Sequence, residues 1–325
     1  MAENRKYFPN KSVILITTRA QHGIPLPPTH LLNMIVWGCL ARAKSMYKIK
    51  VCHFVFMGNH LHMIIVVDCP QHVSQFMTYV KSEISHSINI LLGRRQRTIW
   101  QEGYDSPSLL TPEDVIRYIK YIYLNPTRAG LVEDISEYPG VSSWEMFVSG
   151  NKSKKCKKVS RPQLFKLPAP ALSINEQKKI VEALDAETKA EYEFELEPFA
   201  WIDTFPQLEG IDINDLKQQL LTEIATELNQ LRKERFSQKK RFIGATDLRR
   251  QSMLQKHEPK KFSKKMICIC ADRALRIQYI ELFKHLSRTA YEAYQSWKIG
   301  DLSRKIPPGM FAPRVPELAS ALYPI

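Results

Sequence analysis

The sequence has no long apolar run, no closely spaced cysteine pair and little glycine, and each absence excludes a class of protein. No run of 18 apolar residues occurs in the 325 residues, and the first residues lack the apolar core of a signal peptide, so we expect no membrane span and a cytoplasmic protein. The six cysteines form no CxxC pair, which argues against a zinc finger and favours reduced, mostly buried thiols. The 12 glycines form no phosphate-binding loop, so no attached helicase is expected.

Positive charge is in excess. The chain has 47 Lys and Arg against 33 Asp and Glu, a formal net charge of +14. Such an excess favours a polyanionic partner, and nucleic acid is the first candidate. A merely soluble basic protein is the alternative that charge alone leaves open.

The stretch 51–67 is typical of a β-hairpin with two histidines on one face. Two apolar, β-branched runs flank Gly58-Asn59, a two-residue turn signal. Because successive side chains of a strand alternate between faces, we expect His60 and His62 on the same face. Two neutral imidazoles so placed can bind one divalent ion if a third ligand comes from elsewhere. A hydrogen-bonded polar pair is the simpler alternative.

A second segment carries a tyrosine on a polar helix face. Thr111, followed by a proline and two acids, predicts an N-cap and first turn, and the helix is expected to end at Pro126. Arg117, Tyr121 and Asn125 follow at i, i+4 and i+8, so they share a face away from the apolar stripe. Tyrosine, a His-x-His pair and a basic surface together suggest covalent cleavage of a nucleic-acid strand.

Further elements complete an α+β layer in which helices pack on an antiparallel sheet. We expect a strand over 12–18, helices over 29–47 and 72–92, and a short strand within 105–110.

A basic loop precedes that short strand. Arg94, Arg95 and Arg97 are expected to hold phosphates. Trp100 could stack on a base, but a core anchor is the simpler interpretation.

The charge pattern predicts a domain over 1–150, a lysine-rich basic linker over 151–173 and a mainly helical, basic C-terminal domain over 174–325. Binding of duplex or hairpin DNA by this last domain is weighed equally against a packing extension. Its expected helices cover 174–196, 212–236 and 273–297; the first is acidic and is expected to pack on a basic surface.

The motifs resemble those of the single-tyrosine HUH transposases. Gly-Asn-His60-Leu-His62 is followed by Tyr121-Ile-Tyr-Leu-Asn125-Pro-Thr-Arg128-Ala-Gly, and the stretches 99–105 and 138–143 are similar as well. The match spans about 8–148. It is nearest to the REP-associated tyrosine transposases, a branch of the IS200-like superfamily.

The resemblance implies a ferredoxin-like or RRM-like antiparallel sheet with helices. It also implies that His60 and His62 bind Mg²⁺ or Mn²⁺, that Asn125 is a third ligand or an orienting group, and that Tyr121 is the nucleophile. Arg117 and Arg128 would then join the loop arginines in binding DNA. The family often has a proline where Gly58 stands, a departure that leaves the ligands intact.

Two other tyrosines compete for the role of nucleophile. Tyr121 is favoured because only its i+4 neighbour, Asn125, is an amide that can bind a metal. The i+4 neighbour of Tyr118 is Ile122, and that of Tyr123 is Thr127, which lies beyond the proline at which the helix is expected to end.

The resemblance therefore implies a transposase that cleaves and rejoins hairpin-bearing single-stranded DNA through a 5′-phosphotyrosine. A non-cleaving nucleic-acid binder and a relaxase-like nickase, which often uses two tyrosines, are the alternatives. Monomer and homodimer are both left open, and no membrane partner is expected.

Overall fold

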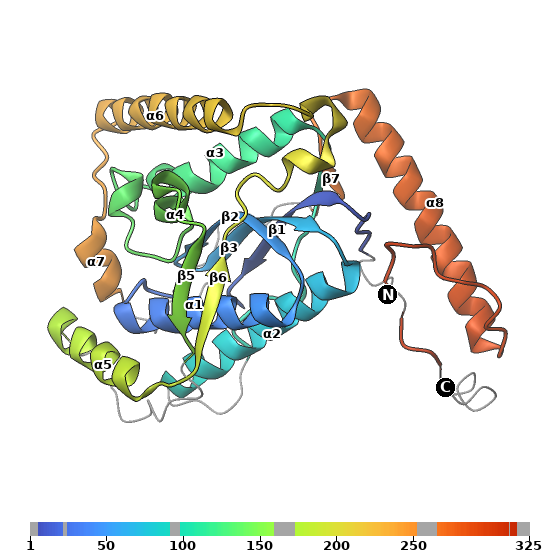
Figure 1. Cartoon of the computed structure of the whole chain (residues 1–325), viewed down its shortest axis with the longest axis horizontal. Coiled ribbons are helices and arrows are strands. Elements are labelled where there is room, and N and C mark those ends of the chain that lie inside the picture. Colours follow the sequence, from blue (N-terminus) through green and yellow to red (C-terminus); the bar gives the residue numbers. More distant parts are fainter. Residues whose placement is uncertain are drawn as a thin grey trace.

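The computed structural model describes residues 6–21, 25–91, 98–158, 173–251, 265–311 and 313–316. Its centre is a five-stranded sheet with helices on both faces (Figure 1). In spatial order the strands are β2 (Lys50–Met57), β3 (His60–Val67), β1 (Ser12–Arg19), β4 (Ser108–Leu109) and β7 (Cys268–Ile269). The main helices are α1 (His30–Met46), α2 (Pro70–Leu91), α3 (Pro112–Arg128), α4 (Trp144–Ser149), α5 (Ile174–Glu187), α6 (Ile213–Ser237), α7 (Ala245–Arg250) and α8 (Arg273–Lys298).

The first six elements have the ferredoxin-like order β1-α1-β2-β3-α2-β4. β1 and β3 are the central strands, and β1 pairs antiparallel with both β3 and β4. β2 pairs antiparallel with β3. The predicted α+β, ferredoxin-like fold is therefore confirmed. Among the described helices, none is both long enough and apolar enough for a bilayer span.

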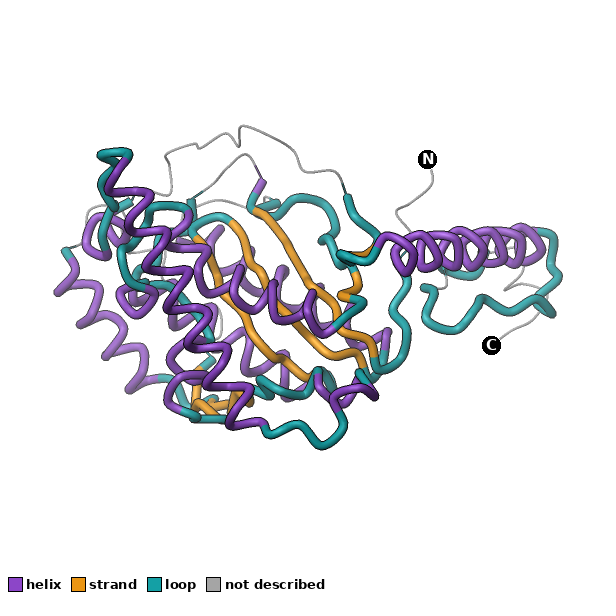
Figure 2. The backbone as a smooth tube through the Cα atoms, turned by 90° about the horizontal axis from the view of Figure 1, so that it is seen from above, coloured by secondary structure: helices purple, strands orange, loops and turns teal. Residues whose placement is uncertain are grey.

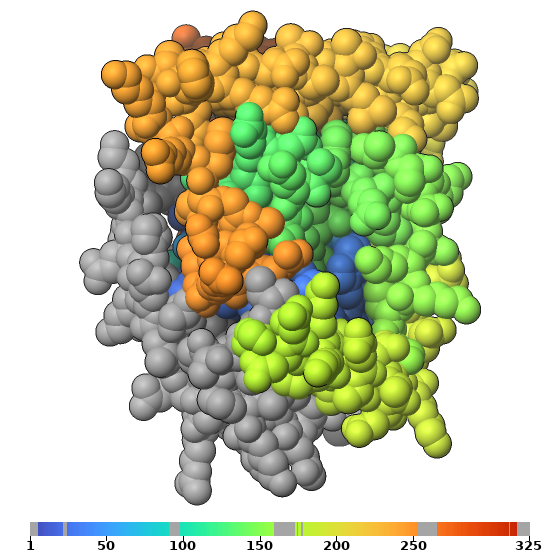
Figure 3. All heavy atoms as spheres, turned by 90° about the vertical axis from the view of Figure 1, so that its left-hand side faces the viewer, coloured from blue at the N-terminus to red at the C-terminus, as the bar shows by residue number. Residues whose placement is uncertain are grey.

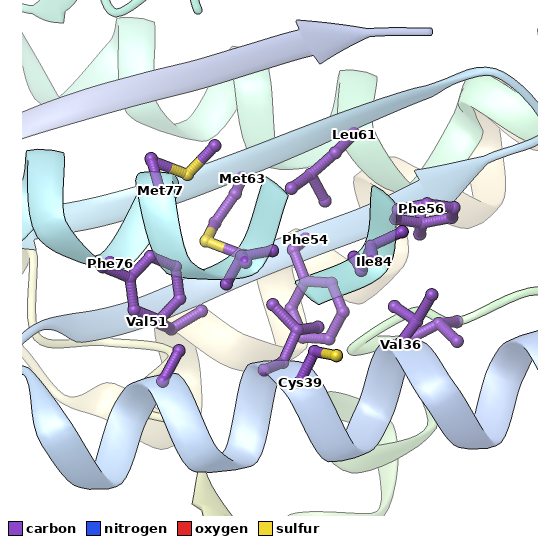
Figure 4. Packing of buried hydrophobic residues seen from close by; sticks show 14 of the residues in the cluster. Val36, Cys39, Val51, Phe54, Phe56, Leu61, Met63, Phe76, Met77 and Ile84 are labelled. Carbon is purple, nitrogen blue, oxygen red and sulfur yellow. The ribbon is translucent and has the colours of Figure 1, made fainter. Parts of the chain in front are cut away.

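Helices α1 and α2 cover one face of the sheet. The Thr29 side chain caps α1 by accepting a hydrogen bond from the Leu32 backbone N–H, as expected for a helix that begins at residue 30. Alternate strand residues such as Phe54 and Met63 meet helix residues such as Cys39 and Phe76 in one core (Figure 4). The alternation predicted for the hairpin is the reason that these residues share this face.

Helix α3 covers the opposite face. Val115, Ile119 and Ile122 are fully buried against strand residues such as Ile64 and Val66. Helix α6 lies outside α3, as the tube in Figure 2 and the space-filling view in Figure 3 both show. The histidine face of the sheet is therefore the face that α3 covers.

Two details of the predicted elements are wrong. Helix α3 does not end before Pro126 but includes it and continues to Arg128. A proline removes one N–H donor, yet the Ala129 N–H still reaches the Asn125 carbonyl and the Leu131 N–H reaches that of Pro126, so the last turn is satisfied.

The predicted acidic helix over 174–196 is the second error. Helix α5 ends at Glu187, and Glu191–Glu195 forms strand β6, antiparallel to β5 (Ser153–Lys157). The alternation Glu-Tyr-Glu-Phe-Glu has the two-residue period of a strand, and it buries Phe194 in the α1 core. Acidic residues do meet a basic surface, since Lys155 and Glu193 are cross-strand partners. Part of the predicted linker is thus strand β5.

Elements of the C-terminal half complete the first half. β7 adds to the sheet edge parallel to β4, with Ser108 opposite Cys268. Leu216, Leu220 and Ile224 of α6 are buried against α3. Helix α8 instead extends away from the sheet (Figures 1 and 2).

Candidate functional site

His60 and His62 lie at the start of β3, on the face that α3 covers. In the β1–β3 register His60 is opposite Arg19 and His62 is opposite Thr17. The two imidazole centres are 4.8 Å apart. The predicted shared face of the two histidines is therefore confirmed.

Each imidazole is held through its Nδ1 atom. In His60 this atom lies 2.6 Å from Asn59 Oδ1, to which it donates, and in His62 it lies 2.9 Å from Thr17 Oγ1. The Thr17 hydroxyl can accept from Nδ1–H of His62, and in that tautomer Nε2 of His62 carries a free lone pair, as it does in His60. Nε2 of His62 is buried and has no hydrogen-bond partner among the described residues.

Burial keeps both imidazoles neutral. Desolvation, with a smaller contribution from the Arg19 charge, lowers the pKa of His60 to about 4. Desolvation, then the neighbouring His60 and then Arg19, lower the pKa of His62 well below its usual value. Both rings are thus uncharged at neutral pH, the form in which imidazole binds a metal.

Tyr121 of α3 lies above the histidines. Its ring centre is 5.3 Å from that of His62, in an edge-to-face arrangement. The residue is half-buried, neither sealed in the core nor on the far side of the sheet. A partly exposed tyrosine therefore stands beside the imidazole of His62, whose other neighbour is His60.

The other two tyrosines of this helix have different surroundings. Tyr123 is 1% exposed, and its hydroxyl lies 2.6 Å from His53 Nδ1 and 3.0 Å from Ser143 Oγ. Burial raises its pKa, so it cannot serve as an accessible nucleophile. Tyr118 packs against Tyr121, with 5.7 Å between the ring centres, and is half-buried, so it is the remaining competitor.

Asn125 lies one helical turn after Tyr121. It is 8% exposed, and its Nδ2 atom has no partner among the described residues. A buried amide without a partner is costly unless a ligand completes it.

The residues present fit a divalent ion in part. The two neutral imidazoles, with Nε2 atoms that have no partner among the described residues, are ligands that such an ion accepts. The unpaired atom of Asn125 is the Nδ2 donor, which suits an anionic oxygen, so a bond from this residue to a metal would have to come from its Oδ1. No group of three His, Cys, Asp or Glu side chains is placed to hold a metal in the part of the chain that the structure describes. An ion here would thus need the amide, a water or a phosphate oxygen to complete its coordination.

Of the five arginines expected to bind nucleic acid, the structure describes two, and both form ion pairs. Arg94, Arg95 and Arg97 lie outside the described residues. Arg117 donates to Asp114 Oδ1 at 2.6 Å, and Arg128 is paired with Glu227 of α6. A role for these two in DNA binding stays a prediction, since each already has an acidic partner.

Two residues of β1 were missed by the motif analysis. Val13, Leu15, Thr17 and Arg19 occupy every second position of β1, so they lie on one face of the sheet, which is the histidine face. Thr17 and Arg19 stand at the end of the strand. The guanidinium of Arg19 has no acidic partner among the described residues, and it is half-buried. The sequence did contain a signal for these two residues, because the apolar residues on this face of the strand give way to polar ones near its end.

Trp100 has the structural role that was favoured. It is 3% exposed and donates from Nε1 to the Lys81 carbonyl at 3.0 Å. All six cysteines are free and five of them are buried, as expected.

Comparison with known proteins agrees with the motifs. Residues 31–123, which include both histidines and Tyr121, match the family described as "Transposase IS200 like". A search among curated proteins finds none that matches. One similar solved structure is titled "Structure of the REP associates tyrosine transposase bound to a REP hairpin"; it is 20% identical, with 46% of this chain and 86% of that chain covered and a TM-score of 0.40. The predicted resemblance is confirmed by the family match, in which residues 31–123 are similar to the IS200-like transposases.

Proposed function

We propose that the chain cleaves and rejoins single-stranded DNA through a 5′-phosphotyrosine at Tyr121. The observation that carries the proposal is the half-buried phenol of Tyr121 beside the neutral imidazoles of His60 and His62. The family match supports the reaction class. The substrate, a strand near a hairpin as in REP elements, follows from the resemblance of the motifs.

In the proposed reaction, the Tyr121 oxygen attacks the scissile phosphorus while the bond to the 3′-oxygen breaks. The phenolic proton passes to solvent, and the released 3′-oxygen takes up a proton. The phosphodiester is thus exchanged for a phosphotyrosine ester. A second 3′-hydroxyl reverses the step and joins a new strand, so no nucleotide cofactor is consumed.

His60 and His62 would hold Mg²⁺ or Mn²⁺ through their Nε2 atoms, with Asn125 as third ligand or orienting group. The bound ion would supply charge neutralisation at the phosphate oxygens. Thr17 and Asn59 hold the two rings through Nδ1, which fixes the direction of the Nε2 lone pairs.

Arg19 fits a phosphate at this place. The positive charge of Arg19 would repel a divalent ion bound by the two imidazoles. A phosphate between Arg19 and the ion would attract both and so remove this repulsion. Since Arg19 has no acidic partner, we assign to it a contact with the DNA backbone.

The test is a search for a covalent adduct. The full chain is incubated with Mg²⁺ or Mn²⁺ and hairpin oligonucleotides with randomised single-stranded flanks, and any adduct stable to denaturation is located by peptide mass mapping. We expect the adduct on Tyr121. The variant Tyr121→Phe should form none, whereas the matched control Tyr118→Phe should keep the reaction, because the edge-to-face contact with His62 is made by Tyr121.

The alternatives give different results. An adduct on Tyr118, or one that persists in Tyr121→Phe, would indicate a nickase with another or a second tyrosine. Metal-dependent binding of the oligonucleotides without any adduct in the wild-type chain would indicate a non-cleaving binder.

A further inference from the structure

Helix α8 carries a row of unpaired cations on a part of the molecule that the proposed reaction does not use. The helix begins after β7 at the sheet edge and extends away from the body (Figures 1 and 2). Asp272 caps its first turn by accepting from the Ala274 and Leu275 N–H groups. With 26 residues, it is roughly 39 Å long.

Contacts near its start and along the segment that follows it connect α8 with the body. Near its start, the Tyr279 hydroxyl lies 2.7 Å from Ser108 Oγ of β4. At its end, Trp297 Nε1 donates to the Arg304 carbonyl at 2.7 Å, and the chain returns until the Phe8 N–H donates to the Gly309 carbonyl at 2.9 Å. The helix and this return segment therefore form an arm fixed to the body at two places.

The outer face of the arm is basic. At 100° per residue, Arg273, Lys284, Arg288 and Lys298 fall within about 40° of one line along the helix, and we call these four the basic stripe. All four are exposed, and none forms an ion pair among the described residues. Glu281 and Glu292 border the stripe on one side only.

Several cations of α3 and α6 are neutralised. Lys120 pairs with Glu223 at 2.8 Å, Arg128 pairs with Glu227, and Arg232 pairs with Asp134 at 2.5 Å. Exposed cations without an ion pair also stand on other described helices, such as Lys178 and Lys179 of α5, so the stripe on α8 is distinguished by four of them along one line of one long helix.

The stripe does not suit an apolar partner. Its exposed apolar neighbours do not form a continuous row. Ile277 and Tyr291 are about four turns apart with charged residues between them. Leu282 lies on another side of the helix, and Ile299 follows its last residue. A docking helix or strand would need a continuous apolar row.

We propose that the basic stripe binds the backbone phosphates of a DNA duplex. A straight helix about as long as one turn of B-form DNA, with cations along one line, can contact phosphates that border a groove at several points along the duplex without reading bases. We identify this duplex as the stem of a hairpin whose single-stranded flank reaches Tyr121. This identification rests on the proposed function, whereas duplex binding by the stripe needs neither Tyr121 nor a metal.

The experiment measures binding of two DNA probes to the full chain by fluorescence anisotropy at several salt concentrations, without divalent metal. One probe is a hairpin with a stem of about one helical turn, ~10 base pairs, and a single-stranded flank. The other is the flank alone. The test variant is Lys284→Glu with Arg288→Glu. The control is Lys178→Glu with Lys179→Glu, which makes the same charge change on exposed residues of α5, at the opposite side of the molecule (Figure 1).

We expect the stripe variant to lose roughly 30-fold in hairpin affinity near physiological salt, with the salt slope smaller by about 1.8, as for two lost phosphate contacts. Affinity for the flank alone should not change, and the α5 control should bind both probes like the wild type. The same loss in the control, the same loss on the flank alone, or unchanged hairpin affinity would each overturn the proposal. Since no cleavage is measured, a failure of the Tyr121 mechanism would not alter this result.

Discussion

At the scale of single residues, Thr17 controls how His62 can act. Its hydroxyl lies 2.9 Å from Nδ1 of the ring, and Nε2 is the nitrogen that has no partner among the described residues. A group that holds the far nitrogen of a metal-binding histidine fixes the direction of its ring. The next residue, Thr18, points to the other face of the sheet, and its buried hydroxyl has no partner in the described structure.

This contrast gives a prediction with an internal control. Thr17→Val should lower the affinity for Mn²⁺ about 10-fold or more, since His62 loses its orienting partner. Thr18→Val makes the same chemical change one residue along and should leave that affinity unchanged. Isothermal titration with Mn²⁺ measures both, and equal effects of the two substitutions would contradict the assigned role of Thr17.

The site was predictable from the sequence only as far as its motifs reach. His60, His62 and Tyr121 stood out because their residue types and spacing are unusual on an apolar strand and an amphipathic helix. Thr17 and Arg19 did not stand out, because their role depends on which residues of β3 lie opposite them. The sequence of β1 alone does not determine that register.

At the scale of elements, α6 shows how one helix is held on another. Four leucine and isoleucine residues on one stripe are buried against α3, and ion pairs such as Arg128 with Glu227 lie around them. Burial of an apolar side chain stabilises a protein considerably more than an ion pair at the surface does. The buried stripe should therefore provide most of the attachment.

Two substitutions in α6 test this division. Leu220 is 1% exposed, so Leu220→Ala should lower the free energy of unfolding by about 2–5 kcal/mol. Glu227→Gln should cost less than about 1 kcal/mol, because both partners of its ion pair are partly solvated. Urea unfolding curves measure both values. A larger cost for Glu227→Gln would mean that charge, and not burial, holds the helix.

Regular elements were predictable where one period dominates. The spacing of apolar residues located β1, β2, β3, α1, α2, α6 and α8 to within a few residues. Strand β6 was missed because its charged residues at every second position also suit a helix surface. The pairing of β4 with β7 joins two-residue strands far apart in sequence, which no local pattern can indicate.

At the scale of the whole molecule, the two halves of the chain share their cores. Leu248 and Ile269 belong to the same buried cluster as Val13 and Ile119, and Phe194 belongs to the cluster under α1. The predicted boundary near residue 150 therefore crosses both cores. Independent folding of the two sides is not expected, since each would expose apolar surface that the other now covers.

A single unfolding transition is the measurable consequence. Thermal unfolding followed by far-ultraviolet and by near-ultraviolet circular dichroism should give coincident midpoints, because helices and buried aromatic residues belong to one cooperative unit. Two well-separated transitions would show instead that the C-terminal part melts as a domain of its own.

The late partner of β4 also matters while the protein is being made. Leu109 pairs with Ile269, so 160 residues must still be added after Leu109 before that sheet edge is covered. At about 5–20 residues per second this takes roughly ten to thirty seconds. Throughout that interval the nascent chain presents an open strand edge, to which another chain with an unpaired strand can add.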